Sequence, residues 1–387
     1  MNILEVLVQD YSWACLLAAF ILGAIVGSFA NVCVSRMPLE KSVLWPGSRC
    51  GSCYQDIRWY DNLPLISYLR LGGKCRTCGS KFSSRYFWFE FLCGAGFAFL
   101  FWAEVVANLR SLPIPPGSMP VGLAGSLILM WLVHCFFFSC LLIATFTDID
   151  YQEIPLMVTV TGTIVGVLTG LVFPWPWPTD PAVAERMFPF WNIALGSNMT
   201  PGSQTVQILP VGAQLWPVWL PTPDWMAPGT PLLGLFTALA GALFGTGLMR
   251  LIRWVFSWAL GKEALGLGDA DLMMMIGAFL GWQAIPFVLL AGVASGLIYV
   301  LGVVVINPKF LQGERVFAFG PFLALGGFAT LLFFWQFVGL TWFLLEIPVQ
   351  VYLFEASVLV QFVVLVLVVG LVTTLAIRML RLMMAAF

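Results

Sequence analysis

The sequence predicts an all-α polytopic membrane protein with about eight to nine transmembrane segments and one small, cysteine-rich cytoplasmic loop. Of its 387 residues, 60% are hydrophobic and 10% are charged, whereas a typical soluble protein has about 25% charged residues. Apolar stretches of about 20 residues, the length that spans a lipid bilayer, recur along the chain, and basic residues gather between them. The net charge of -1 gives no sign of a nucleic-acid partner.

The first half of the chain alternates apolar spans with one long basic loop. Residues 13–34 are expected to form the first transmembrane segment, because no basic leader or cleavage site marks them as a signal peptide. Residues 35–87 hold nine of the 18 basic residues against three acidic ones, so the positive-inside rule places this loop in the cytoplasm. Residues 88–173 are expected to carry three further spans. Two lie at about 88–107 and 123–146, and the third follows a short link from Asp148 to Pro155 and ends near residue 173.

The second half begins with residues 174–230, a Pro/Trp-rich insertion that we expect to lie outside, against the membrane interface. Residues 231–345 are expected to form further membrane segments, and residues 346–387 an extra C-terminal one. Nine segments, with the N-terminus outside and the C-terminus inside, place every basic cluster in the cytoplasm. These later segments are expected at about 232–256, 271–280, 287–306, 319–338 and 358–376.

Two aspartates stand at the ends of apolar stretches that are expected to meet the cytoplasmic face. Asp148 follows one such stretch, and Asp269 follows the glycines Gly266 and Gly268 and opens another. A carboxylate at the edge of the hydrocarbon layer is costly, and neighbouring glycines let another backbone approach it closely. Two carboxylates in one partly dry site share a proton and can activate water. Asp148 and Asp269 are therefore predicted to be the catalytic pair of a membrane-embedded aspartyl hydrolase.

Two further aspartates, Asp150 and Asp271, each lie two residues beyond a member of the pair and are expected to support it, together with Gly266 and Gly268. The alternative is that each aspartate caps a helix N-terminus, where negative charge is favourable. For Asp150, the helix-capping role and the supporting role are equally favoured.

Four cysteines in the basic loop have the spacing of a metal site. Two Cys-x-x-Cys pairs are separated by 21 residues, which resembles a zinc ribbon, and a reducing cytosol disfavours disulfides. A structural zinc ion would let so small a loop fold without a large core. A redox or unliganded role is the alternative. The predicted ligands are Cys50, Cys53, Cys75 and Cys78.

The single histidine, His134, lies in the middle of an apolar span. A serine or cysteine nucleophile would have to use it, but no convincing nucleophile shares its face, so we expect it to pack or to form a hydrogen bond. The sequence has no His-Glu-x-x-His pattern, and a metalloprotease site is unsupported.

In combination, these motifs resemble the bacterial type IV prepilin peptidases, the leader peptidase/N-methyltransferases with a Gly-x-Gly-Asp active site. The resemblance covers most of residues 20 to 330. It rests on Gly27–Val32, Arg36–Pro38, the two cysteine pairs, Trp59–Pro64, Ser67–Leu69, Ser84–Tyr86, Glu90, Asp148–Asp150 with Ile154–Pro155, Gly266–Asp269, Gly277–Gln283 and Phe319–Ala324.

The resemblance implies two activities on the cytoplasmic side of the bacterial inner membrane. One is cleavage of the leader peptide of prepilins or pseudopilins by Asp148 and Asp269, with one aspartate as general base on a water and the other, protonated, bonding the scissile carbonyl. The other is methylation of the new N-terminus from S-adenosylmethionine, to which Asp61, Asn62 and Glu90 are possible contributors. The sequence does not assign base and acid within the pair.

The chain departs from the family pattern at Asp271, where lysine is common, as well as in the 174–230 insertion and the final apolar segment. The alternatives to the bifunctional enzyme are a peptidase without methyl transfer, a proton-coupled transporter and a non-catalytic assembly protein. A transporter would place its aspartates near mid-membrane and usually shows internal repeats.

Overall fold

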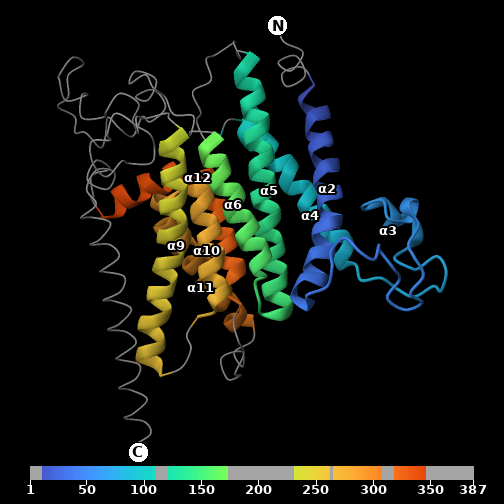
Figure 1. Ribbon diagram of the computed structural model, residues 1–387. Coiled ribbons are helices and arrows are strands. Elements are labelled where there is room, and N and C mark those ends of the chain that lie inside the picture. Colours follow the sequence, from blue (N-terminus) through green and yellow to red (C-terminus); the bar gives the residue numbers. More distant parts are fainter. Residues whose placement is uncertain are drawn as a thin grey trace, which may run out of the picture. The chain divides into compact units, whose positions relative to one another are not determined.

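The computed structural model describes residues 11–107, 109, 121–172, 231–261, 265–306 and 318–345. Contacts divide the chain into two compact units, residues 1–110 with 114–158, and residues 111–113 with 159–387, and each unit is described by itself. The described residues form helices, short helical turns and isolated bridges (Figure 1). The all-α fold class is therefore confirmed. The predicted segment at 358–376 and the 174–230 insertion lie outside the described residues.

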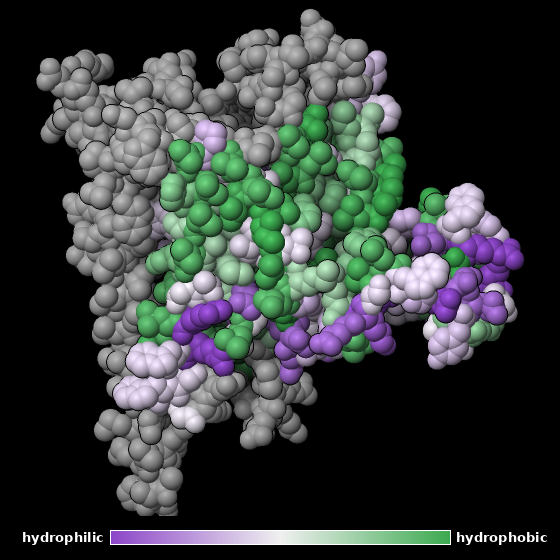
Figure 2. All heavy atoms as spheres, in the orientation of Figure 1, coloured by the Kyte–Doolittle hydropathy of each residue, from purple (hydrophilic) through white to green (hydrophobic). Residues whose placement is uncertain are grey.

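The first unit contains three long helices and the loop that joins two of them. Helix α2 spans Ser12–Arg36, α4 spans Arg85–Phe101 and continues as a π-helical turn over Trp102–Val106, and α5 spans Val121–Tyr151. The loop between α2 and α4 contains one short helix, α3, over Ile66–Leu71. Figure 2 shows hydrophilic residues gathered on this loop, whereas apolar residues cover the helices.

Small residues let α2 and α4 pack closely, as is usual where lipid tails give no hydrophobic drive between helices. A Cβ atom on Gly23 would lie 2.7 Å from the Cys93 carbonyl oxygen, and one on Gly94 would lie 2.9 Å from the Phe20 carbonyl oxygen. Helix α5 completes this unit's core, where Phe89 of α4 and Phe146 of α5 meet edge to face with ring centroids 4.8 Å apart.

The second unit contains five described helices, of which α10 is the most buried. Its core is formed by α10 side chains that include Leu272, Met273, Met275 and Ile276. The helices are α6 (Leu156–Val172), whose first residues belong to the other unit, α9 (Pro231–Leu260), α10 (Leu267–Leu280), α11 (Ile285–Ile306) and α12 (Gly320–Leu345), which is kinked at Phe333.

Five helices among the described residues are long and apolar enough to cross a membrane, and two shorter apolar helices, Leu156–Leu171 and Gly320–Phe334, accompany them. Two expected boundaries are wrong. Helix α5 continues to Tyr151, so Asp148 lies in its last turn rather than in a link, because no helix breaker precedes Pro155. Helix α10 begins at Leu267 rather than at Asp271, so Asp269 lies within its first turn.

Candidate functional site

The four predicted ligand cysteines meet in the loop between α2 and α4. The sulfur atoms of Cys50, Cys53, Cys75 and Cys78 all lie within 4.8 Å of one another. The Sγ atoms of Cys50 and Cys78 are 3.7 Å apart, close to the separation of about 3.8 Å that a tetrahedral zinc ion with 2.3 Å bonds to sulfur imposes. These residues therefore fit a structural zinc ion.

Each cysteine pair is carried by the same backbone turn. In the first, the Tyr54 N–H donates to the Cys50 carbonyl at 2.9 Å; in the second, the Gly79 N–H donates to the Cys75 carbonyl at 2.9 Å. Tyr54 and Gly79 both have positive φ, of 58° and 72°. An isolated β-bridge closes each turn, Arg49 with Asp56 and Lys74 with Lys81. The loop thus contains two equivalent knuckles, each of which supplies two thiols.

A single hydroxyl prepares two of the thiols for metal binding. The Ser80 Oγ lies 3.4 Å from the sulfur of Cys50 and 3.1 Å from that of Cys78. The bond to Ser80, followed by bonds from the backbone of Cys53 and Ser52, lowers the pKa of Cys50 to about 5. The Ser80 bond also lowers the pKa of Cys78, whereas, against a backbone bond from Gln55, burial and the neighbouring thiols raise the pKa of Cys53 to about 11. Because the thiolate is the form that binds metal, Cys50 and Cys78 favour a bound cation.

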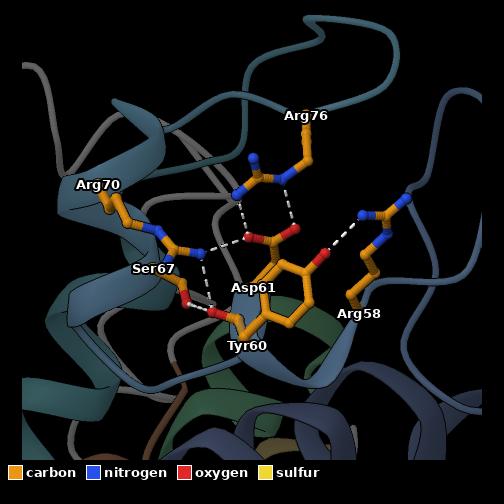
Figure 3. A network of polar contacts seen from close by, with 6 residues as sticks. All are labelled: Arg58, Tyr60, Asp61, Ser67, Arg70 and Arg76. Atoms are coloured by element: carbon orange, nitrogen blue, oxygen red, sulfur yellow. Dashed lines mark hydrogen bonds and ion pairs between the residues drawn. The ribbon is translucent and has the colours of Figure 1, made fainter.

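A polar network joins the second knuckle to α3 (Figure 3). The Asp61 carboxylate accepts two bonds from Arg76, at 2.7 and 2.6 Å, and one from Arg70 of α3, at 2.6 Å. The Arg76 bonds, followed by the Arg70 bond, lower the pKa of Asp61. Arg70 also donates to the Tyr60 carbonyl at 3.0 Å. Since Arg76 lies between Cys75 and Cys78, the network fixes the second knuckle against α3.

Glu90 of α4 links the loop to the membrane helices. Its carboxylate accepts the Leu65 N–H at 2.8 Å and a bond from Ser28 of α2. Leu65 is the centre of a γ-turn with φ 60° and ψ −50°, in which the Ile66 N–H donates to the Pro64 carbonyl at 2.6 Å. Such a conformation is strained for a residue other than glycine, so the bond to Glu90 helps to hold it.

Asp148 lies in the last turn of α5 and its side chain is buried, with 7% of the residue exposed. Asp150, one of the expected supporting residues, forms an ion pair with Arg85 at the start of α4, and the Arg85 guanidinium lies 5.3 Å from the centre of the Phe146 ring. The Asp150 pair places the end of α5, and Asp148 with it, beside the start of α4, where the basic loop ends.

Asp269 lies in the first turn of α10 in the second unit and is also 7% exposed. Gly266 precedes the helix, and a Cβ atom there would lie 3.7 Å from an Asp269 carboxylate oxygen, an ordinary contact. Asp271 lies 3.5 Å from Arg250 of α9, so a basic partner offsets the extra negative charge expected there. Because Asp148 and Asp269 belong to different units, their pairing stays a prediction.

One buried ionisable pair was missed by the sequence reasoning. Glu104, in the π-helical turn after α4, lies with its Oε1 atom 2.5 Å from Nδ1 of His134 in α5. Both residues are buried. The hydrogen-bonding role expected for His134 is confirmed, but its partner is 30 residues away and no sequence pattern connects them.

Comparison with known proteins covers most of the chain. Residues 21–104 match the Bacterial Peptidase A24 N-terminal domain, and residues 205–301 match the Type IV leader peptidase family. The chain is 30% identical over 342 residues to the type 4 prepilin-like proteins leader peptide-processing enzyme of Escherichia coli O78:H11, which covers 84% of this chain and 96% of that protein. The chain belongs to the type IV leader peptidase family.

Two further members of the type IV leader peptidase family bear the name prepilin leader peptidase/N-methyltransferase. The protein of Stutzerimonas stutzeri is 27% identical over 346 residues, which cover 82% of this chain and 91% of that protein. The protein of Pectobacterium carotovorum is 30% identical over 331 residues, which cover 79% and 89%. No solved structure matches the chain. The first family match contains the cysteine loop and Glu90, and the second contains Asp269.

Proposed function

We propose that this protein is a membrane aspartic endopeptidase that cleaves the leader peptide of prepilins or pseudopilins and then methylates the new N-terminus. The observation that carries the proposal is the 30% identity to a leader peptide-processing enzyme over 96% of that enzyme's length. The names of the relatives supply both activities, and the two buried aspartates supply acid–base groups for the cleavage.

The proposed cleavage uses Asp148 and Asp269 as a pair that shares one proton. One carboxylate removes a proton from a water as the water attacks the scissile carbonyl, and the other, protonated, donates a hydrogen bond to the carbonyl oxygen. The pair exchanges these roles when the tetrahedral intermediate collapses and the leaving amine takes a proton.

The two helix ends favour different charge states for the two aspartates. Asp269 lies at the N-terminus of α10, whose partial positive charge favours a carboxylate, whereas Asp148 lies at the C-terminus of α5, whose partial negative charge disfavours one. We therefore infer that Asp269 is the base on the water and that Asp148 is the proton donor. The helix-capping alternative fits Asp269 but not Asp148.

The proposed orientation puts the active site on the cytoplasmic side of the inner membrane. The loop with nine basic residues belongs inside by the positive-inside rule, and the Arg85–Asp150 ion pair supports placing Asp148 on that same side. Arg250 and Arg253 near the end of α9 support the same side for Asp269.

The methyl transfer is assigned to the N-terminal region, residues 35–87 with α4. S-adenosylmethionine, as the second substrate, would supply the methyl group. The cysteine cluster, with zinc bound, would hold the loop in shape. Asp61 is bonded to Arg70 and Arg76, and Glu90 holds Leu65, so both residues are proposed to position the loop, and Asn62 stays a suggestion.

The decisive experiment co-expresses the protein with a prepilin-like substrate and measures the mass of the substrate's N-terminus. Asp148→Asn and Asp269→Asn should each lower the cleavage rate by at least about 10²-fold. Of the two variants, Asp148→Asn should keep the higher residual rate, because an amide N–H can still donate to the scissile carbonyl. Glu153→Gln, which changes an exposed carboxylate just beyond the end of α5, is the matched control. Normal cleavage by either catalytic variant would remove that residue from the pair, and cleavage without an added methyl group would leave a peptidase alone.

A further inference from the structure

The turn that follows α2 exposes two large apolar side chains outside the helices. Leu44 and Trp45 are each 79% exposed, so no described residue covers either of them. Single exposed apolar residues are common on protein surfaces, but two adjacent ones of this size at the tip of a turn call for a partner. We name residues 42–47 the Leu44–Trp45 turn.

The Leu44–Trp45 turn is fixed to the end of a membrane helix. Arg36, the last residue of α2, donates from Nη1 to the carbonyls of Ser42 at 3.1 Å and Pro46 at 2.8 Å, and from Nη2 to the carbonyl of Gly47 at 3.3 Å. The turn therefore lies within one arginine side chain's reach of the helix end. Figure 1 also shows the loop beside the lower half of α2 rather than beyond it. Since the end of a membrane-spanning helix lies near the lipid headgroups, the bonds from Arg36 hold the turn near that layer.

The charges beside the turn match an anionic surface. Lys41 precedes the turn, is exposed and forms no ion pair with any described residue, and Arg36 carries a second positive charge at the turn's base. The loop as a whole has nine basic residues against three acidic ones. Tryptophan and leucine beside lysine and arginine are the residues that enter the interfacial layer of a bilayer.

We propose that the Leu44–Trp45 turn inserts into the bilayer surface, and that Lys41 and Arg36 bind the headgroups of anionic phospholipids there. The turn is then a third membrane anchor of the cysteine loop, beside α2 and α4. It holds the two knuckles against the bilayer surface, and this anchoring does not depend on the cleavage chemistry proposed above.

The test uses the full-length protein in lipid nanodiscs with a photo-crosslinking residue, Trp45→p-benzoylphenylalanine. Ile25, which is 54% exposed in the middle of α2, receives the same residue as the matched lipid-facing control. After irradiation in phosphatidylcholine alone or with added phosphatidylglycerol, mass spectrometry identifies the molecule attached at each position. Because Trp45 is 79% exposed, its replacement should leave the fold intact, and an unchanged thermal unfolding temperature verifies this.

The expected result is a phospholipid adduct at both positions. The yield at position 45 should rise by about twofold or more with phosphatidylglycerol, Lys41→Glu should remove that rise, and the yield at position 25 should not change. Lipid adducts at position 25 without any at position 45 would overturn the proposal. A cross-link from position 45 to a protein segment would do the same, since it would make the turn a protein-docking surface. A yield that is independent of lipid charge would overturn the headgroup contact.

Discussion

Replacing Gly241 of α9 with alanine should disable cleavage without touching any residue assigned to the chemistry. A Cβ atom at position 241 would lie 2.0 Å from the Gly277 carbonyl oxygen and 2.8 Å from its carbonyl carbon. Real Cβ atoms essentially never approach closer than 3.0 Å, so the backbone of α10 must retreat by about 1 Å. Because α10 carries Asp269, the carboxylate moves with it.

The expected size of the effect follows from that displacement. Overpacking of this kind costs about 1–3 kcal/mol of stability, and a misplacement of about 1 Å at a reacting group lowers the rate by about 10²-fold. The assays are the cleavage rate on a prepilin-like substrate in vesicles and the thermal unfolding of the purified, monodisperse protein. We expect Gly241→Ala to lower both the rate and the unfolding temperature.

Gly247, on the same helix, provides the control. A Cβ atom there has no neighbour within 4 Å, and alanine is favoured over glycine in a helix by up to about 1 kcal/mol. Gly247→Ala should therefore cleave normally and unfold at the same or a higher temperature. If Gly241→Ala cleaves its substrate as fast as Gly247→Ala, close packing of α9 on α10 does not position Asp269.

Three further predictions concern the loop and its attachment. Cys75→Ser should reduce the bound zinc, measured by elemental mass spectrometry, from about one ion per chain to a small fraction. The control Cys140→Ser, in the buried part of α5, should leave the zinc content unchanged. Equal zinc contents in the two variants would refute the metal site. Glu90→Ala should speed hydrogen exchange at the Leu65 amide by at least about tenfold, which corresponds to the loss of about 1.5 kcal/mol for a charged hydrogen bond. Glu90→Gln keeps an acceptor and should keep most of the protection. Similar exchange rates in the two variants would contradict the anchoring role of Glu90. Arg76 and Arg70 lower the pKa of Asp61, so the network's contribution to stability is complete above the ordinary pKa of 3.8 and is lost as the pH falls through the lowered pKa. The NMR resonance of the Arg76 Nε–H should therefore titrate with a midpoint below pH 3.8. A midpoint at or above that value would refute the pairing.

The sequence was most informative where chemistry depends on residues close together in the chain. The cysteine spacing predicted four thiols that the structure brings within 4.8 Å, because each Cys-x-x-Cys pair forms its own turn. The apolar spans predicted the helices for the same reason: a span's length and polarity are local properties.

Features that depend on distant partners could not be predicted in this way. Glu104 and His134 lie in two different apolar spans, and only the packing of α4 and its π-helical turn on α5 makes them a pair. Glu90 binds a backbone N–H, a donor that every residue except proline has, so nothing in the sequence marks Leu65 as its partner. The extension of α5 to Tyr151 was missed because the apolar stretch ends before Asp148, whereas the Arg85 ion pair stabilises Asp150 within the helix.

The two knuckles have a consequence for how this loop can vary. Each presents its sulfur atoms through backbone bonds, from Tyr54 to Cys50 and from Gly79 to Cys75. The side chains inside each pair can therefore vary without changing the arrangement of the four thiols. Arg76 is the exception, because its guanidinium is committed to Asp61. Sequence variation among relatives should therefore concentrate at Gly51 and Ser52 and spare Arg76. The two knuckles, although alike in their backbone, should differ in this respect.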